Sequence, residues 1–282
     1  MAFVELFYEA EGVVGEGPYW DWRDNSLLMV DITGGRALKL SSHAGLIWER
    51  QFDNHVGSII GIEDSADYLL VEQRGISRMD LGGKRHEILT LIEAGEQKRF
   101  NDAKADPAGR LWAGVMGYEK NPGDGALYSY QANGLMHQMI TDLTVPNGMD
   151  WSNDGSTMYF IDSPTRRIGV YDFDLATAEL TLRSSIAIEL PGNPDGMTVD
   201  ADGNLWVALW DGGAVIQLSP TGKLLQEIKL PVSRVTSCTF GGRDFTKLFI
   251  TTASLGVTED LAGSVFVVDT DTQGRHANLF KA

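Results

Sequence analysis

Residues 193–210 read NPDGMTVDADGNLWVALW and predict one complete β-hairpin. A tight turn at Pro194-Asp195-Gly196 leads into the alternating run 197–199, and a second apolar strand is expected over 205–209. The Asp202-Gly203 pair between the two runs accepts positive φ, which a tight hairpin turn requires. This stretch is therefore a strong hairpin signal.

The same pattern recurs along the chain at steps of 42 to 48 residues. The other copies are EGPYWDWRDNSLLMVD from Glu16, SIIGIEDSADYLLVE from Ser58, NDAKADPAGRLWAGVM from Asn101, NGMDWSNDGSTMYFID from Asn147 and SCTFGGRDFTKLFIT from Ser237. Repeats of about 40–50 residues that contain several strands are typical of propeller blades. Six copies without a linker between them predict an all-β, six-bladed β-propeller that forms a single domain over residues 1–282.

A ring of blades has to be sealed where its two ends meet. Residues 3–8 (FVELFY) predict a lone strand before the first blade, and we expect it to pair into the blade formed by the C-terminal residues. Such pairing removes an exposed sheet edge. Helical periodicity is absent, and only a short turn at 92–95 is expected.

Charge and composition exclude several classes of protein. The net charge of −16 and the pI near 4.6 argue against binding to nucleic acid or to an anionic membrane surface. The single cysteine, Cys238, allows no intrachain disulfide and is expected to be a small buried residue. The first residues lack the basic region of a signal peptide, and no apolar run approaches the roughly 18 residues of a membrane span. We therefore expect a soluble, cytoplasmic protein.

Equivalent positions of a propeller repeat meet at one mouth of the central channel. The residues that open the six hairpins are Glu16, Ser58, Asn101, Asn147, Asp195 and Ser237. Two carboxylates and two amides among them favour a hard divalent cation, whereas soft ligands are missing. The alternative is that Asp and Asn stand there because they cap turns at the start of a strand.

Two further patterns resemble functional motifs but have structural explanations. Residues 200–204 (DADGN) look like the start of an EF-hand loop, yet they lack flanking helices and fall on a hairpin turn. Trp112 and Trp206 share one position of the repeat, which is typical of packing between blades.

Together these segments resemble a known family. EGPYW, RFNDAKADPAGRLWAG, PNGMDWS, YFIDS, PDGMTVDADGNLWVA and SCTFGG are similar, in order, to motifs of the senescence-marker-protein, regucalcin and gluconolactonase family. The resemblance implies a six-bladed propeller with one divalent metal ion in the channel. It also implies hydrolysis of sugar-acid lactones.

The resemblance assigns roles to individual residues. Glu16, Asn147 and Asp195 fall on the family's metal ligands, and Arg99 and Asn101 fall on its substrate-contacting pair. Glu119 falls on a position that contacts the sugar, although the segment after it, 121–125, is shorter than in animal members. The metal ion would polarise the lactone carbonyl, and Asp195 would act as ligand and general base. Arg99 would bind the oxygens of the substrate and of the carboxylate that forms.

Three functions remain open at this point. The leading one is a metal-dependent lactonase acting on a small-molecule sugar lactone, with Ca²⁺, Zn²⁺, Mg²⁺ or Mn²⁺ as the metal ion. A second is a propeller hydrolase for other esters or organophosphates. A third is a regucalcin-like calcium-binding protein without turnover, which would have no need of Arg99 and Glu119 beside the metal.

Overall fold

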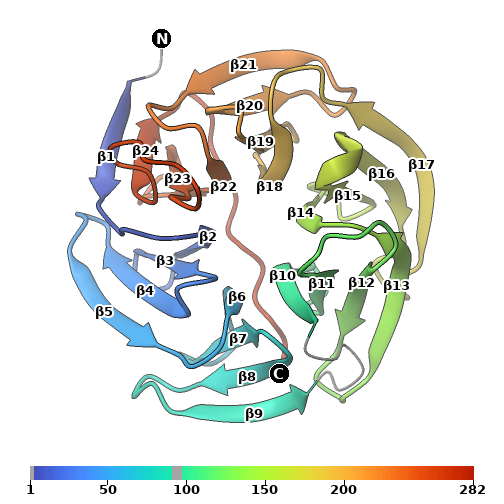
Figure 1. The fold of residues 1–282 in the computed structure, drawn as a ribbon. Helices are drawn as coiled ribbons and strands as arrows, with labels where there is room; N and C mark the ends of the chain where they lie inside the picture. The colour runs from blue at the N-terminus through green and yellow to red at the C-terminus, as the bar shows by residue number, and fades with distance from the viewer. Residues whose placement is uncertain (1–2, 91–96) are drawn as a thin grey trace.

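The computed structural model describes residues 3–90 and 97–282 as six four-stranded antiparallel sheets arranged in a ring (Figure 1). The six-bladed β-propeller predicted by the repeat is confirmed. Helical structure in these residues amounts to one 3-10 turn, η2 (Ser163–Thr165). The turn expected at 92–95 lies outside the described residues. No described helix has the length and apolar character needed to cross a membrane.

Each blade runs outward from the channel, with one strand at each of four distances from it. The innermost strands are β2 (Gly15–Asp21), β6 (Val56–Gly61), β10 (Lys98–Ala105), β14 (Pro146–Trp151), β18 (Asn193–Val199) and β22 (Val235–Gly241). The second strands are β3 (Ser26–Asp31), β7 (Tyr68–Glu72), β11 (Leu111–Gly117), β15 (Thr157–Asp162), β19 (Leu205–Trp210) and β23 (Lys247–Thr252). The third strands are β4 (Arg36–Ser41), β8 (Gly75–Met79), β12 (Gly125–Tyr130), β16 (Arg167–Phe173), β20 (Ala214–Leu218) and β24 (Val265–Asp269). The outermost strands are β5 (Leu46–Gln51), β9 (Arg85–Thr90), β13 (Met136–Leu143), β17 (Leu180–Ala187), β21 (Leu224–Lys229) and β1 (Val4–Tyr8).

The sequence of each strand reflects its distance from the channel. The second strand β3 (SLLMVD) is buried along its whole length, because neighbouring blades cover both of its faces. The outermost strand β21 (LLQEIK) is exposed at every position but one. Continuous apolar runs therefore mark the interior strands, and mixed polar runs mark the rim.

The ring is closed by the first strand of the chain. β1 pairs antiparallel with β24, with Val4 opposite Val268 and Leu6 opposite Phe266. Phe7 adds an edge-to-face contact with Phe249 at 4.9 Å between ring centroids. The closure predicted from residues 3–8 is confirmed, and the last blade has no open edge on β24.

A repeated turn anchors the hairpins between the two inner strands. The carboxylate of Asp200 accepts backbone hydrogen bonds from Asp202 and Asn204, and a third from the indole N–H of Trp206 at 2.9 Å. Asp106 makes the equivalent bond to the indole N–H of Trp112 at 2.9 Å. The segment 200–204 is thus a structural turn, as expected.

Both tryptophans pack between blades. Trp112 lies edge-to-face against Trp151, and Trp206 lies edge-to-face against Phe240. Cys238 donates to the carbonyl of Trp206 and is buried, and burial raises the pKa of its thiol to about 12. A thiol with that pKa is not a nucleophile at neutral pH.

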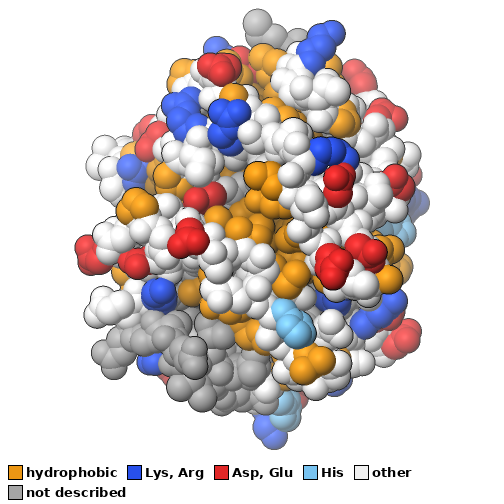
Figure 2. Space-filling view, turned by 90° about the vertical axis from the view of Figure 1, so that its right-hand side faces the viewer, with side chains coloured by type: hydrophobic (Ala, Val, Ile, Leu, Met, Phe, Trp, Pro, Cys, Tyr) orange, Lys and Arg blue, Asp and Glu red, His pale blue; other side chains and the backbone are white. Residues whose placement is uncertain are grey.

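The C-terminal stretch, residues 273–281, crosses the centre of the ring and spans one end of the channel (Figure 1). Gln273 accepts a hydrogen bond from the amide of Ala201, and the amide of Phe280 donates to Gly61 on the opposite side. This C-terminal segment, residues 273–281, covers one mouth of the channel. Figure 2 shows the outer wall of the ring over β13 and β17, where charged side chains of both signs lie beside an apolar strip.

Candidate metal and substrate site

Three of the predicted site residues sit on irregularities of their strands. Asn101, Asn147 and Asp195 each lie where the ladder between an inner strand and its neighbour shifts register. The shifts fall between Phe100 and Ala103, between Pro146 and Met149, and between Pro194 and Met197. Such a bulge bends the strand and re-aims a side chain, and bulges are frequent beside active sites. Here all three side chains contribute to the lining of one cavity.

The glycine after each of two site residues permits a close approach between blades. A Cβ on Gly148 would lie 2.4 Å from the carbonyl oxygen of Asp195, and a Cβ on Gly196 would lie 2.0 Å from Oγ of Ser237. Neither position has room for a side chain. The Pro-Asn-Gly and Pro-Asp-Gly motifs therefore place a ligand-type side chain and a close contact in consecutive residues.

Glu16 occupies a different position of the repeat from the other three. It still pairs with Val30, and the irregularity of β2 begins only after it. Gly17 follows with a φ of +53°, and its amide donates to Oε2 of Glu16 at 2.8 Å. The expectation that four polar residues share one repeat position is thus wrong for Glu16, because the bulge of β2 starts one residue later in the motif.

Ser58 and Ser237 also lie beyond the bulge position, paired with Val71 and Thr251. The hydroxyl of Ser58 donates to the carbonyl of Gly57 and accepts from the amide of Ala103, so it links two blades. Neither serine lines the cavity that holds the other four residues.

That cavity has a volume of about 580 Å³ and opens at the mouth opposite the C-terminal segment. Glu16, Asn101, Asn147 and Asp195 are all buried and form part of its lining. Its apolar lining includes Val14, Ile32, Trp210 and Leu255. Its polar lining includes His55, Arg99, Tyr118 and Lys120. The volume suits a small organic molecule.

Glu16 and Asp195 form an acidic pair in this lining. Burial raises the pKa of Glu16 well above its usual range, and the nearby charges of Asp195 and Asp102 raise it further. Burial, followed by the charge of Asp102, likewise raises the pKa of Asp195. Asp102 lies next in the channel, where burial raises its pKa to about 6. The site therefore brings together carboxyl groups whose charged form is unfavourable in the metal-free protein and would be stabilised by a bound cation.

The donor atoms of Asn147 and Asp195 fit a divalent cation. Nδ2 of Asn147 donates to Oγ of Ser163 at 3.1 Å, which leaves its Oδ1 as the free end of the amide. Oδ1 of Asn147 and Oδ1 of Asp195 are both buried, and neither has a hydrogen-bond partner among the described residues. Buried oxygens are seldom left without a partner. Two carboxylates and an amide oxygen are the ligand types of a hard cation.

Among the described residues, no group of three or more His, Cys, Asp and Glu side chains is arranged so that it could hold a metal ion. The predicted ligand set is compatible with that finding, because one of its three members is an asparagine. Asn101 differs from Asn147, since its Oδ1 accepts from Nη1 of Arg99 at 2.7 Å and its Nδ2 donates to Pro146. Both polar atoms of Asn101 are thus occupied by the protein.

Arg99 forms a cationic wall beside the acidic pair. Its Nη1 donates to the carbonyl of Phe100 and to Asn101, and no described carboxylate forms an ion pair with it. Burial lowers the pKa of Arg99, as expected for a cation without a direct partner. Next to it, Nδ1 of His55 lies 3.0 Å from the hydroxyl of Tyr118, and burial together with the charge of Arg99 lowers the pKa of His55. This wall presents donors and a positive charge to a ligand.

Glu119 lies outside this arrangement. Its side chain is exposed and does not line the cavity, whereas its neighbours Tyr118 and Lys120 do. The backbone turns sharply here, with a φ of +52° at Lys120. The sugar contact expected of Glu119 stays a prediction. The sequence analysis did not identify His55, Tyr118 and Lys120 as cavity residues. For Tyr118 and Lys120 the one available signal was their position beside Glu119, and His55 had no such signal.

Comparison with known proteins identifies the family of this chain. The family model described as SMP-30/Gluconolactonase/LRE-like region matches residues 14–254. Regucalcin of Gallus gallus is 37% identical over 272 residues, which cover 90% of each chain. The structure of a luciferin-regenerating enzyme is 31% identical, covers all of both chains and superposes with a TM-score of 0.94.

A second solved structure shares the fold at lower identity. The calcium-binding protein regucalcin from Agrobacterium tumefaciens is 24% identical, covers 100% of this chain and 98% of its own, and gives a TM-score of 0.92. The family match spans all of the inner strands that carry the site. The chain belongs to the SMP-30/gluconolactonase/LRE-like family.

Proposed function

We propose that this protein hydrolyses a sugar-acid lactone with the help of one divalent metal ion. The observation that carries the proposal is the pair of buried, unpartnered oxygens on Asn147 and Asp195, next to the carboxyl of Glu16, in the lining of a 580 Å³ cavity. A cavity of that size beside an oxygen-donor set suits a small polar substrate.

The acidic pair and the amide would hold the metal ion. Glu16 and Asp195 supply two negative charges, and Asn147 supplies its free Oδ1. When bound, a divalent cation supplies Lewis acidity that polarises the lactone carbonyl, which contributes several kcal/mol to catalysis. It would also lower the pKa values of the two carboxyls that burial has raised.

Asp195 would act as the general base. Its carboxylate takes a proton from water as the water oxygen bonds to the carbonyl carbon. The bond between that carbon and the ring oxygen then breaks, and the proton passes to the ring oxygen. The product is a hydroxy acid, and general-base assistance of this kind contributes about 10²–10⁴-fold.

Arg99 and Asn101 would orient the substrate. Arg99 has unused donors at the cavity wall, and its positive charge favours the carboxylate that forms. Asn101 fixes the guanidinium through its Oδ1. A contact from Glu119 would require its exposed side chain to turn toward the cavity.

Two other functions use the same site. A regucalcin-like protein that binds calcium without turnover is favoured by the relative described as a calcium-binding protein. A hydrolase of other esters or organophosphates would use the same metal chemistry. The cationic wall of Arg99 beside the cavity supports an enzyme, because a protein that only stores metal has no need of it.

The test is hydrolysis of a panel of aldonolactones, followed with a pH indicator. The protein is stripped with a chelator, and Ca²⁺, Zn²⁺, Mg²⁺ or Mn²⁺ is restored one at a time. Activity that disappears with the chelator and returns with a metal ion supports the proposal. Tight metal binding without turnover on any lactone supports the calcium-binding function instead. Turnover restricted to other esters supports the ester or organophosphate hydrolase.

A further inference from the structure

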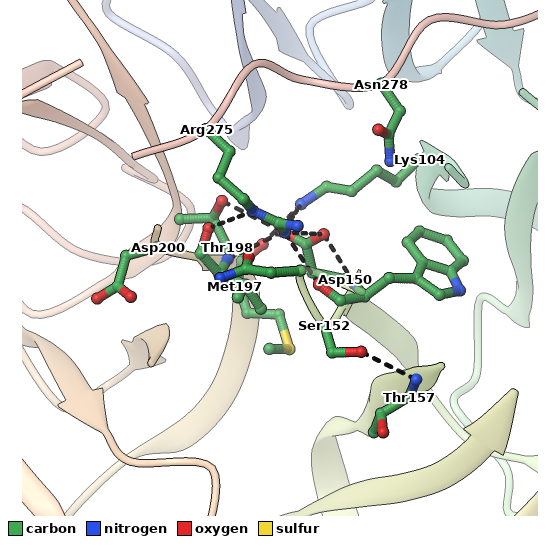
Figure 3. A network of polar contacts seen from close by, with 12 residues as sticks. Lys104, Asp150, Ser152, Thr157, Met197, Thr198, Asp200, Arg275 and Asn278 are labelled. Carbon is green, nitrogen blue, oxygen red and sulfur yellow. Dashed lines mark hydrogen bonds and ion pairs between the residues drawn. The ribbon is translucent and has the colours of Figure 1, made fainter. Parts of the chain in front are cut away.

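Asp150 lies on the same inner strand as Asn147, three residues further into the channel. Its buried carboxylate contacts the inner strands on both sides (Figure 3). Oδ2 accepts from Nζ of Lys104 on β10 at 3.2 Å, and from the amide of Val199 on β18 at 2.9 Å. The hydroxyl of Thr198 adds a third bond at 3.3 Å. One carboxylate therefore connects β10, β14 and β18.

These are the three strands that carry Asn101, Asn147 and Asp195. Lys104 follows Asn101 by three residues, just as Asp150 follows Asn147 and Thr198 follows Asp195. The contacts thus form one layer of the repeat, about 10 Å along the strands from the site layer at about 3.3 Å per residue. Lys104 also donates to the carbonyl of Met197 on β18 at 2.9 Å.

Arg275 of the C-terminal segment forms hydrogen bonds with this layer from the mouth that the segment covers. Nη2 of Arg275 donates to Oδ1 of Asp150 at 3.2 Å and to the carbonyl of Trp151 at 2.9 Å, while its Nε donates to the carbonyl of Val199. Figure 3 shows Arg275 and Lys104 reaching the same carboxylate from different parts of the chain. Residue 275 lies beyond the part of the chain that the family model matches.

The two cations keep Asp150 ionised in its buried position. Burial acts to raise the pKa of Asp150, but the charges of Lys104 and Arg275 and two backbone amide bonds bring it below the usual value. A buried carboxylate with two such partners is strongly held, since removing one partner would leave a buried charge uncompensated.

The site layer needs this support because the sheet ladder is interrupted there. Asn101, Asn147 and Asp195 sit at register shifts, so regular pairing with the second strand does not fix them. Their spacing depends on how the three inner strands are held against one another. Ligand oxygens must keep their geometry within about 0.5 Å for tight binding.

We propose that Asp150 is a positioning residue of the metal site: with Lys104 and Arg275 it fixes the spacing of the strands that carry Asn101, Asn147 and Asp195. The inference rests on the proposed metal site. Asp150 itself touches neither the cavity nor the ligand atoms.

Asp200 provides a matched control in the next blade. It is also buried, and its carboxylate accepts five hydrogen bonds from backbone amides and side chains. All of these bonds stay within its own sheet, to residues 202, 204, 206 and 217. Asp200→Asn should therefore lower stability without changing the spacing between blades, whereas Asp150→Asn should change both.

The first measurement is metal affinity, by titration calorimetry of the stripped protein with Ca²⁺ and with Zn²⁺ alone. We expect Asp150→Asn and Arg275→Gln to weaken binding about tenfold to a hundredfold, as for other residues that hold metal ligands in place. Asp200→Asn should bind the metal ion with wild-type affinity, even where its melting temperature falls as far as that of Asp150→Asn. Wild-type affinity in both Asp150→Asn and Arg275→Gln would overturn the proposal.

The second measurement needs no metal ion. Hydrogen exchange of the metal-free protein should become at least about tenfold faster in segments 98–103, 145–149 and 193–197 of Asp150→Asn and Arg275→Gln. In Asp200→Asn the faster exchange should be confined to segment 199–206. Unchanged exchange in the three site segments would refute the positioning role. A wild-type protein that binds neither metal would refute the proposed function, while the exchange data would still decide whether Asp150 fixes the strands.

Discussion

Asn147 and Asp195 occupy the same bulge position of adjacent inner strands, and each has a buried Oδ1 for which residues 3–90 and 97–282 supply no hydrogen-bond partner. Each is followed by a glycine that has no room for a side chain. The two strands therefore approach each other with two ligand-type oxygens left unpaired.

Replacing either carboxyl of the acidic pair should abolish most of the activity without lowering the melting temperature of the metal-free protein. Asp195→Asn and Glu16→Gln remove carboxyls whose pKa values burial has raised. We expect lactone turnover to fall by at least about a hundredfold while the metal-free protein melts at the same temperature or higher at pH 7, because a buried charge is removed. Kinetics and calorimetry of both variants test this, with Asp172→Asn, which changes an exposed side chain on β16, as control. Full activity in both variants would contradict the site.

The stabilisation that a metal ion gives should increase with pH, because the metal-free protein loses stability as the pH rises. Because the folded pKa values of Glu16 and Asp195 are raised, the folded metal-free protein binds more protons than the unfolded chain above about pH 4. Their contribution is fully present below that pH and is lost as the pH rises through the folded pKa values. The increase in melting temperature on adding Ca²⁺ should therefore grow from pH 5 to pH 8. A constant or shrinking increase would argue against this pair as ligands.

Arg99→Ala should act mainly on substrate affinity. The guanidinium has no acidic partner among the described residues and lines the cavity. Losing a charge-assisted hydrogen bond of about 1.5–3 kcal/mol predicts a KM increase of about ten- to a hundredfold with a smaller change in kcat. Steady-state kinetics decide this, and Arg99→Lys should retain part of the affinity. An unchanged KM would show that the arginine is structural.

Tyr118 and Glu119 offer a comparison between neighbours. The hydroxyl of Tyr118 lies in the cavity wall, 3.0 Å from Nδ1 of His55, whereas Glu119 is exposed. We expect Tyr118→Phe to raise KM several-fold and Glu119→Ala to have the smaller effect, each measured on the lactone that the wild type prefers. A larger effect from Glu119→Ala would indicate that its side chain reaches the substrate.

Deletion of residues 1–8 should prevent accumulation of folded protein. It removes β1 and leaves β24 with an open edge, and it removes the contact between Phe7 and Phe249. The soluble fraction after expression is the measurement. Phe3→Ala, which changes an exposed side chain, serves as control. A truncated protein with the wild-type melting temperature would show that the ring does not depend on this strand.

The repeat predicted the fold because a similar sequence pattern forms the inner hairpin of each blade. Asp200 and Trp206 mark a turn whose carboxylate and indole are hydrogen-bonded, and Asp106 with Trp112 repeats it. Local chemistry of this kind is visible in the sequence. The strand that closes the ring was also predictable, because a lone strand at one end has few places to pair.

Features that depend on contacts between distant segments were not predictable. The one-residue offset of Glu16 follows from where the bulge of β2 begins, which the motif does not reveal. Tyr118 enters the cavity because the chain turns at Lys120, and His55 meets it from another blade. Arg275 lies in a segment without repeat character, so nothing in its sequence indicated that it would bind Asp150.

The pairing of β1 with β24 has a consequence for the order of events during synthesis. The strand that contains Val4 has no pairing partner until Val268 has been synthesised. Blades built from consecutive strands are able to form one after another as the chain leaves the ribosome, but the circle closes only after β24 has emerged. A nascent chain stalled before β24 would hold finished blades in an open arc, with Glu16 still far from Asp195, so the proposed metal site would be assembled only after β24 has joined the ring.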